Sequence, residues 1–241
     1  MLTNNHKKLV KSLLQKKQRD NHACFVAEGP KVIGEFIQAG FRLEHLFSTD
    51  MTLFPQENTI QVNEKELKAM SSLSTPNACL AVFAIPSEKH LPDSGLKVAL
   101  DAIRDPGNLG TIIRLCDWFG VTELVCSIDT VDCYNPKVVQ ATMGSLARVN
   151  IHYLDLNAYL TESELPVYGA FLDGESVYTH TLPEEGILVM GNEANGIGAD
   201  IEEWVTQRIS IPRFGELQAT ESLNVATATA IILSEFKRAS L

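Results

Sequence analysis

The stretch VALDAIRDPGNLGTIIR, Val98–Arg114, decides the fold. The apolar run Val98–Ile103 leads into a loop with one proline and two glycines, and a pattern with apolar residues at helical spacing follows. Five further apolar runs lie beyond it, separated mostly by helical patterns: Leu124–Ile128, Val149–Leu154, Val167–Leu172, Ile187–Met190 and Ile209–Ile211. Short apolar strands that alternate with helices predict an α/β fold with a parallel sheet covered on both faces.

A second, smaller α/β domain is predicted before this region. Residues 86–95 contain two prolines and a glycine, break the periodicity and are interpreted as a linker between domains at 1–85 and 96–241. In the first domain we expect a basic N-terminal helix, a strand at Cys24–Glu28 and a helix from about Pro30 to Ala39. Short strands near Leu46–Phe47 and Leu80–Ile85 complete the domain.

The charge is distributed unevenly along the 241 residues. The net charge of −10 argues against broad, sequence-blind binding of nucleic acid, which needs a footprint of Lys and Arg. Residues 1–19 nevertheless carry six Lys or Arg and no acid, so any attraction to RNA is expected to be local. A solvated helix face explains the same lysines equally well.

The five cysteines are scattered and do not form metal-binding or disulfide patterns. We therefore expect buried, core-filling thiols and no metal site. The chain also lacks an apolar signal segment near its start and has no run approaching the roughly 18 apolar residues of a membrane span. These features predict a cytoplasmic protein that does not enter a membrane.

Three glycine-bearing loops follow predicted strands, at residues 105–110, 191–198 and 212–215. Loops in this position form the usual ligand site of an open α/β sheet. The phosphate-binding loop of kinases is excluded because Ile197 and Gly198 stand where it needs Lys and Ser or Thr. The dinucleotide pattern GxGxxG is missing from the first strand–helix junction, and the hydrolase pattern GxSxG is absent from the chain.

Several polar residues of these loops are candidates for chemistry, each with an ordinary structural alternative. We predict that Asn108 caps a helix that ends at Gly120 and that Arg114, one turn beyond Gly110, reaches the loop as a phosphate clamp. Arg114 could equally form a surface ion pair. Glu193 either binds backbone donors or contacts a substrate, and Ser222 and Asn224 could simply cap a C-terminal helix running to about Arg238.

Three stretches, taken in order, resemble the three motifs of the SpoU/TrmH family of RNA methyltransferases. They are Asn108-x₅-Arg114, Gly191-x-Glu193-x-x-Gly196 and Ser222-Leu223-Asn224-Val225. The likeness covers about residues 97–238. Two N-terminal stretches, Phe25–Pro30 and Thr75–Val82, resemble the smaller substrate-binding domain of that family. This second likeness favours the ribosomal-RNA branch of the family over the transfer-RNA branch.

The resemblance implies a C-terminal α/β domain with a deep trefoil knot of the SPOUT type, and an N-terminal domain with a ribosomal-protein-L30-like (L30e-like) fold. It implies a homodimer formed through the C-terminal domain, S-adenosylmethionine as cofactor, and methyl transfer to a ribose 2′-hydroxyl of RNA. The cofactor contacts fall on Gly191, Ile211 and Leu223. The catalytic residues fall on Asn108, Arg114, Glu193, Ser222 and Asn224.

The chain departs from the family pattern at two places. Residues 216–221 lengthen the loop before Ser222, and Gln140 stands where an arginine is common. The long loop is the one feature that favours an alternative, a catalytically inactive RNA-binding or ribosome-assembly protein that retains the knotted fold. A base methyltransferase on a related fold is a further alternative, but it is expected to lack this pairing of Arg114 with Ser222-Leu223-Asn224.

Overall fold

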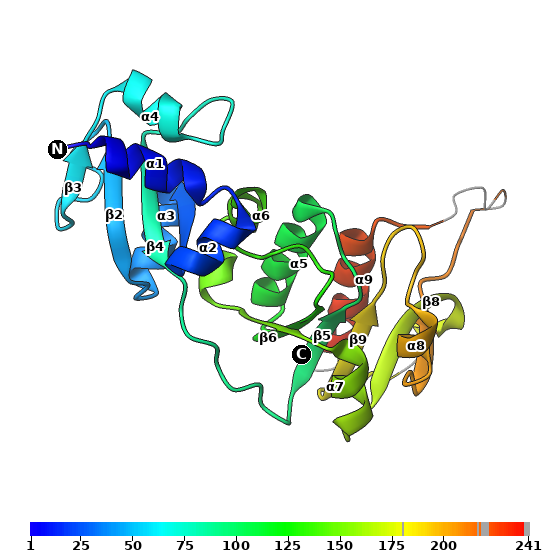
Figure 1. Ribbon diagram of the computed structural model, residues 1–241. Coiled ribbons are helices and arrows are strands. Elements are labelled where there is room, and N and C mark those ends of the chain that lie inside the picture. Colours follow the sequence, from blue (N-terminus) through cyan, green and yellow to red (C-terminus); the bar gives the residue numbers. More distant parts are fainter. Residues whose placement is uncertain (180, 216, 218–221, 239–241) are drawn as a thin grey trace. The chain divides into compact units, whose positions relative to one another are not determined.

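The computed structural model describes the whole chain except residues 180, 216, 218–221 and 239–241. The chain forms two compact units (Figure 1). The first contains Met1–Glu88 and Asp132–Arg148, and the second contains Lys89–Val131 and Val149–Leu241. Within the described residues, no helix has the length and hydropathy needed to cross a membrane.

The second unit is built on a six-stranded sheet in which all neighbouring strands are parallel, in the order β10-β8-β9-β5-β6-β7. Its strands are β5 (Leu96–Leu100), β6 (Glu123–Ser127), β7 (Asn150–Leu154), β8 (Val167–Ser176), β9 (Gly186–Met190) and β10 (Gln207–Ser210). Every residue of β5 and of β9 is buried, as strands covered on both faces require. The prediction of a parallel sheet from the apolar runs is confirmed.

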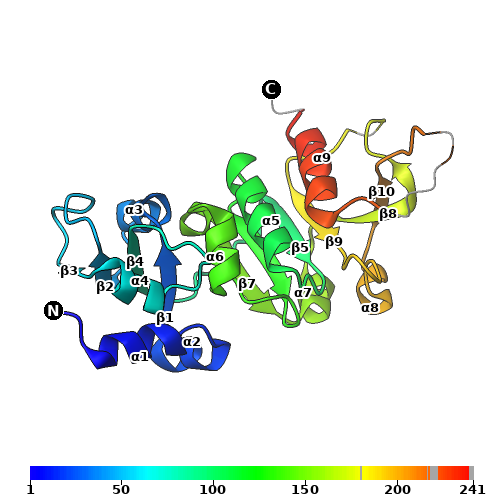
Figure 2. The ribbon, with the colours of Figure 1, turned by 90° about the horizontal axis from the view of Figure 1, so that it is seen from above.

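Helices cover both faces of this sheet and confirm the α/β fold class. They are α5 (Pro106–Trp118), α7 (Leu156–Glu162), α8 (Ala199–Glu202) and α9 (Val225–Arg238). Figure 2 shows α5 and α9 together on one face and α7 and α8 on the other. Leu156 and Leu160 of α7 pack in one cluster with Ala99, Val125 and Ile187 of the sheet.

The first unit contains a four-stranded sheet in the order β1-β4-β2-β3. Its elements are α1 (Asn4–Ser12), α2 (Lys16–His22), β1 (Cys24–Glu28), α3 (Pro30–Gln38), β2 (Leu43–Ser48), β3 (Thr59–Gln61), α4 (Glu64–Met70) and β4 (Cys79–Ala84). The strands β1, β2 and β4 and the helix α3 were predicted. The prediction of one basic N-terminal helix is wrong, because Gln15 adopts an extended conformation and separates α1 from α2.

The five cysteines are free and buried, which confirms their predicted packing role. Burial raises the pKa of the Cys116 thiol to about 12, so that this side chain stays protonated at neutral pH. Within the residues that the structure describes, no group of three or more His, Cys, Asp or Glu side chains could hold a metal ion.

The segment Asp132–Arg148 lies between β6 and β7 in the sequence, but it packs in the first unit. It contains α6 (Pro136–Thr142) and a short 3₁₀ helix, η1 (Ser145–Ala147). The Tyr134 ring lies 4.8 Å from the Phe25 ring of β1, measured between centroids. At Gly144 a β-carbon would lie 2.5 Å from Cγ of Glu35, so only glycine permits this approach.

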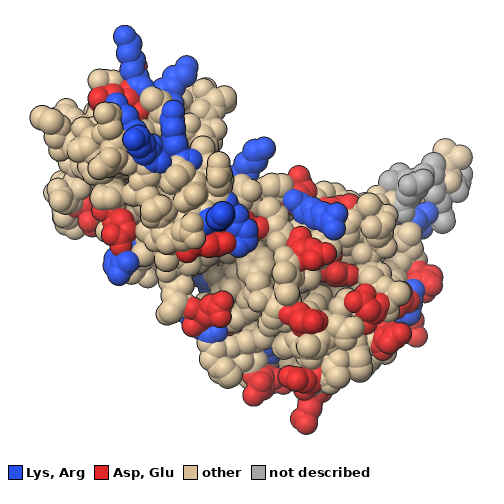
Figure 3. All heavy atoms as spheres, in the orientation of Figure 1, with Lys and Arg blue, Asp and Glu red and all other residues tan. Residues whose placement is uncertain are grey.

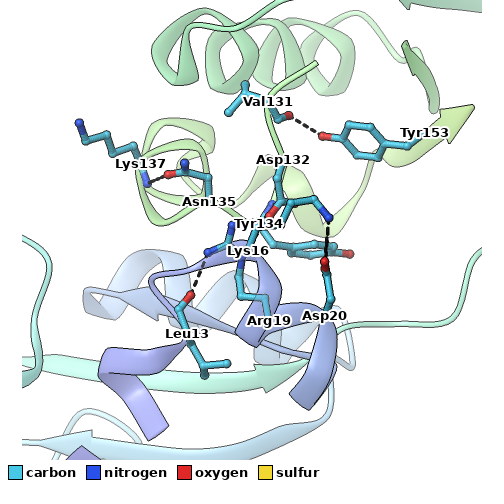
Figure 4. Close-up of polar contacts among 10 residues, drawn as sticks. All are labelled: Leu13, Lys16, Arg19, Asp20, Val131, Asp132, Tyr134, Asn135, Lys137 and Tyr153. Carbon is cyan, nitrogen blue, oxygen red and sulfur yellow. Dashed lines mark hydrogen bonds and ion pairs between the residues drawn. The ribbon is translucent and has the colours of Figure 1, made fainter. Parts of the chain in front are cut away.

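A buried ion pair joins this segment to α2 (Figure 4). Arg19 is 2% exposed, and its Nε and Nη2 donate to Oδ2 of Asp132 at 2.9 and 2.5 Å. Its Nη1 donates to the Leu13 carbonyl oxygen at 2.9 Å, at the end of α1. Residues 132–148 fall within the 96–241 domain predicted from the sequence. This polar contact and the Tyr134 packing give the physical reason for their place in the first unit.

Replacing Arg19 should destabilise the protein much more than replacing an exposed arginine. The Arg19→Ala variant leaves the Asp132 carboxylate without its cation, and we expect a loss of about 3–5 kcal/mol of unfolding free energy in urea. Arg42→Ala is the matched control, because Arg42 also pairs with a carboxylate, Glu44, but is 78% exposed. The control should lose no more than about 1 kcal/mol. Equal losses in the two variants would contradict this account of the buried pair.

Candidate active site

A cleft of about 1260 Å³ lies in the second unit, between β8 and the loops that follow the carboxyl ends of β9 and β10. This is the edge at which parallel sheets of α/β proteins bind ligands. The three predicted cofactor residues, Gly191, Ile211 and Leu223, all line the cleft. Glu193 and Ser222 line it as well, so five of the eight predicted site residues share one cavity.

The loop after β9 is closed by two hydrogen bonds between Asn192 and Gly196. The Asn192 N–H donates to the Gly196 carbonyl at 2.9 Å, and the Gly196 N–H donates back at 2.8 Å. This tight closure brings Gly191 so near that a β-carbon there would lie 2.2 Å from the Gly196 carbonyl carbon. Gly196 itself has a φ of +70°. The backbone of this loop therefore requires both glycines of the Gly-x-Glu-x-x-Gly spacing.

Two further hydrogen bonds attach the β9 loop to the loop after β5. Nδ2 of Asn192 donates to the Ala102 carbonyl at 2.6 Å, and the Gly198 N–H donates to Oδ2 of Asp101 at 2.7 Å. Asp101 and Ala102 directly follow β5 in the sequence. The loop that carries Glu193 is thus held at both of its ends against the central strand of the sheet.

A chain of hydrogen bonds joins the three sequence motifs. Nδ2 of Asn224 donates to Oδ1 of Asn108 at 2.9 Å, and Nδ2 of Asn108 donates to Oε1 of Glu193. Oδ1 of Asn224 accepts from the backbone N–H groups of Ala226 and Thr227 at 3.0 and 3.2 Å. Asn224 therefore caps α9, which was one of the two alternatives for this residue, and it also contacts another motif. The two roles are compatible because different atoms carry them: the side-chain oxygen caps the helix, and the side-chain nitrogen contacts Asn108.

Asn108 does not cap α5, and that prediction is wrong. Asp105 is the cap, because its Oδ1 accepts from the Asn108 backbone N–H at 2.8 Å and Pro106 occupies the first helical position. Asp105 therefore takes the capping role and leaves the Asn108 amide free to bridge Glu193 and Asn224. The predicted end of the helix is confirmed, since Gly120 follows Phe119 with a φ of +67°.

Within the part of the chain that the structure describes, Arg114 and Ser222 make no contact that assigns them a role. Arg114 is exposed on α5 and does not line the cleft. Among the residues that the structure describes, neither the Arg114 guanidinium nor the Ser222 hydroxyl has a hydrogen-bond partner. Glu221 and most of the long loop, residues 216 and 218–221, lie outside the described residues.

One wall of the cleft was not predicted from the sequence. Residues 170–173 in the middle of β8 line it, and the Arg208 guanidinium lies 3.6 Å from the centre of the Phe171 ring. Nη2 of Arg208 donates to Oδ1 of Asp173 at 2.6 Å, and this hydrogen bond lowers the pKa of the Asp173 carboxyl. The signal was present in the sequence, since the apolar run Val167–Leu172 ends at this wall.

The cleft combines apolar walls, a tight backbone loop and carboxylates, and these features fit a cationic nucleoside. Ile209, Ile211 and Leu223 offer apolar surface for a base, and the bare backbone at Gly191 allows close approach of a ligand. Of the three carboxylates that line the same cavity, Asp173 and Glu202 already pair with Arg208, and Glu193 is the one that can favour positive charge. Its volume exceeds the roughly 300–1,000 Å³ of most small-molecule sites. S-adenosylmethionine, a nucleoside with a sulfonium, is compatible with all of these features.

Two family models match the chain. The model described as the SpoU rRNA Methylase family matches residues 95–234, and the MRM3-like substrate binding domain matches residues 4–81. The 23S rRNA (guanosine(2553)-2′-O)-methyltransferase of Bacillus subtilis is 31% identical over 232 residues, which cover 92% of each chain.

Solved structures resemble the chain over nearly its whole length. A structure from Porphyromonas gingivalis that is assigned to the TrmH family of RNA methyltransferases has a TM-score of 0.90 and 39% identity, and the match covers 99% of each chain. An rRNA methyltransferase from Sinorhizobium meliloti with bound S-adenosylmethionine has a TM-score of 0.87 and 29% identity, over 100% of this chain and 97% of that one.

A methyl group added at Gly191 should abolish tight cofactor binding. Because the β-carbon of Gly191→Ala would lie 2.2 Å from Gly196, the loop must move out of its closed conformation. We expect the affinity for S-adenosylmethionine, measured by calorimetry, to fall by at least about tenfold, or 1.4 kcal/mol. Gly34→Ala is the control, since a β-carbon there meets nothing within 4 Å. Unchanged affinity in Gly191→Ala would show that the loop does not bind the cofactor.

Proposed function

This chain belongs to the SpoU rRNA methylase family, and from this premise we propose that it methylates a ribose 2′-hydroxyl of ribosomal RNA. Its enzyme class, an S-adenosylmethionine-dependent RNA methyltransferase, follows from the same relatives. The observation that carries the proposal is the chain of hydrogen bonds from Asn224 through Asn108 to Glu193 at the rim of the cleft. Ribosomal RNA is favoured over transfer RNA because the Bacillus relative is named for 23S rRNA.

The cofactor supplies a methyl group on a positively charged sulfur, which leaves with its electron pair when the carbon–sulfur bond breaks. Residues Gly191, Ile211 and Leu223 hold the cofactor in the cleft that they line. Transfer of that methyl group to the ribose oxygen would release the 2′-hydroxyl proton to solvent or to a nearby base. The protein would contribute chiefly by holding the cofactor and the ribose in position.

Glu193, Asn108 and Asn224 act as positioning residues in this scheme. Each amide in the chain has a fixed orientation, because Asn224 uses its oxygen for the α9 cap and Asn108 uses its oxygen for Asn224. The Asn108 amide nitrogen is thereby directed at Glu193. The chain links the start of α9, next to the cofactor residue Leu223, to the loop that carries Glu193. Ser222 lines the cleft beside Leu223, and its proposed role is to order the cofactor loop.

Arg114 stabilises negative charge in this proposal. A guanidinium stays protonated at ordinary pH and is a poor base. It can instead attract the neighbouring phosphate and the oxygen that gains negative charge as the 2′-hydroxyl loses its proton. Its exposed position on α5 leaves the guanidinium accessible to RNA.

The finer parts of the proposal are the trefoil knot and the homodimer formed through the C-terminal domain, which come from the family, and a cytoplasmic location. The domain boundaries at 1–85, 86–95 and 96–241 are proposed as divisions of the sequence only, because residues 132–148 fold with the first unit. Support for the knot comes from the similarity to SpoU and TrmH structures. No observation favours an inactive RNA-binding protein, since the long loop that suggested one lies mostly outside the described residues.

The Arg114→Ala variant tests the catalytic proposal. Methyl transfer from labelled S-adenosylmethionine to unmodified 23S rRNA is measured with both substrates saturating. We expect kcat to fall by about 10²–10³-fold, the usual effect of losing one group that stabilises developing charge. Lys89→Ala, which removes an exposed cation of the same unit, should leave kcat unchanged. Near-normal turnover by Arg114→Ala would remove Arg114 from the mechanism.

The two contacts of Asn224 can be separated by substitution. Asn224→Asp keeps an oxygen for the α9 cap but cannot donate to Asn108, so we expect near-native stability with methyl transfer reduced at least about tenfold. Asn224→Ala removes both contacts and should also lose about 1 kcal/mol of unfolding free energy. Stability is measured by urea unfolding and activity with 23S rRNA. Wild-type turnover in Asn224→Asp would reduce Asn224 to a helix cap.

A further inference from the structure

Two exposed aromatic side chains, Phe214 and Tyr178, pair with each other at the cleft of the second unit. Phe214 lines the cleft and is 83% exposed, although phenylalanine is usually a buried residue. The Tyr178 ring lies beside it, with 6.4 Å between the ring centroids and an angle of 36° between the ring planes. This distance is typical of aromatic pairs. The proposed contacts with the cofactor do not involve Phe214.

The pairing of two strands brings these rings together. Ser210, the last residue of β10, pairs in register with Ser176, the last residue of β8. The Val177 N–H also donates to the Ser210 carbonyl at 2.9 Å, which extends the contact beyond β8. Tyr178 lies two residues after β8, and Phe214 lies four residues after β10. The parallel pairing of the strands therefore places Phe214 at the cleft, with a second ring beside it.

The proposed reaction brings a nucleobase to this part of the cleft. The oxygen that accepts the methyl group is on C2′ of the ribose, and the base is attached to the adjacent carbon, C1′. The base of the methylated nucleotide must therefore lie close to the bound methyl donor. Phe214 lines the same cleft as the proposed cofactor residues Gly191, Ile211 and Leu223. A ribose in position for methyl transfer thus carries its base toward the exposed Phe214 ring.

Net charge gives the second unit little means of holding a nucleotide. This unit carries 8 Lys and Arg against 20 Asp and Glu. Figure 3 shows Asp and Glu side chains over α7 and α8 of the unit. Stacking of a base on an aromatic ring needs no cation, and it is a common contact in proteins that bind unpaired RNA. An exposed phenylalanine in an acidic unit is suited to this contact.

The cofactor is a poorer occupant of the Phe214 ring than a base of the RNA. Ile209, Val225 and Ile232 line the same cleft and are at most 5% exposed. They offer the cofactor's adenine an enclosed apolar surface, as small-molecule sites usually do. Phe214 is far more exposed than these three residues, so its ring is better placed for a molecule that arrives from solvent.

We propose that the Phe214 ring stacks on the base of the nucleotide whose ribose is methylated. This inference rests on the proposed function, because it takes RNA as the substrate. The base must lie outside a duplex stack, either in a loop or flipped out of a helix, because a face of the base has to be free for the ring. Every base has such a face, so the ring contributes affinity and orientation and does not select one base over another.

Phe214→Leu tests the proposal, because it removes the ring and keeps an apolar side chain. Methyl transfer to unmodified 23S rRNA, made by transcription, is measured over a range of RNA concentrations. We expect kcat/KM for the RNA to fall by about 5- to 150-fold, the usual effect of losing the stack between one base and an aromatic ring. Phe214→Tyr keeps a flat aromatic face and should keep the wild-type value. Trp118→Leu is the matched control, because Trp118 is also 83% exposed but does not line the cleft.

Further readouts separate stacking on RNA from other uses of the ring. In Phe214→Leu, the affinity for S-adenosylmethionine by calorimetry, the unfolding free energy in urea and the oligomeric state by light scattering should all stay at wild-type values. A loss of cofactor affinity would assign the ring to the cofactor, and a changed oligomeric state would assign it to a contact between copies of the chain. Either result would overturn the proposal.

The same measurements distinguish this inference from the proposed function. If the wild-type protein methylates the RNA and Phe214→Leu has the kcat/KM of the Trp118→Leu control, the stacking is wrong and the proposed function stands. An equal loss in Phe214→Tyr and Phe214→Leu would also rule out stacking, because the tyrosine retains the aromatic face. If the wild-type protein transfers no methyl group to RNA, the proposed function is wrong and the stacking is wrong with it.

Discussion

The hydrogen bonds that join Asn224, Asn108 and Glu193 connect segments up to 116 residues apart in the sequence. They require the loops after β5 and β9 and the helices α5 and α9 to be in place. The all-parallel sheet places the loops after β5 and β9 at one edge, the Asp105 cap frees the Asn108 side chain, and the start of α9 must lie within reach of α5. Because each amide is oriented by its neighbour, the carboxylate of Glu193 and the start of α9 are positioned together.

The parallel sheet could be predicted because its strands are buried on both faces and so form unbroken apolar runs. β3 escaped detection because it has only three residues and none of them is buried. The helix α4 carried a readable signal, since Asn63 and Glu66 form a capping box. At α5 two capping residues competed, and the residue before the proline, Asp105, took the role assigned to Asn108. Local rules identified the helix but not which of two polar residues caps it.

The site could be predicted only through the resemblance between ordered motifs, since each motif alone had an ordinary structural explanation. That resemblance named five residues that line the cleft and three in the hydrogen-bond chain, with Glu193 in both groups. It did not place residues 132–148, because their position depends on Arg19 and Phe25, more than 100 residues away in the sequence. The pattern of apolar residues within the segment cannot indicate a contact with residues so distant in the sequence.

Mapping of ribose methylation in ribosomal RNA, in cells with and without the gene, tests the central claim most directly. The account predicts that one 2′-O-methylated nucleotide of the large-subunit RNA is lost with the gene and returns when the gene is restored. The 2′-O-methyl groups at all other positions should be unaffected. Identical maps from the two kinds of cell, or the loss of a methyl group from a base instead of a ribose, would contradict it.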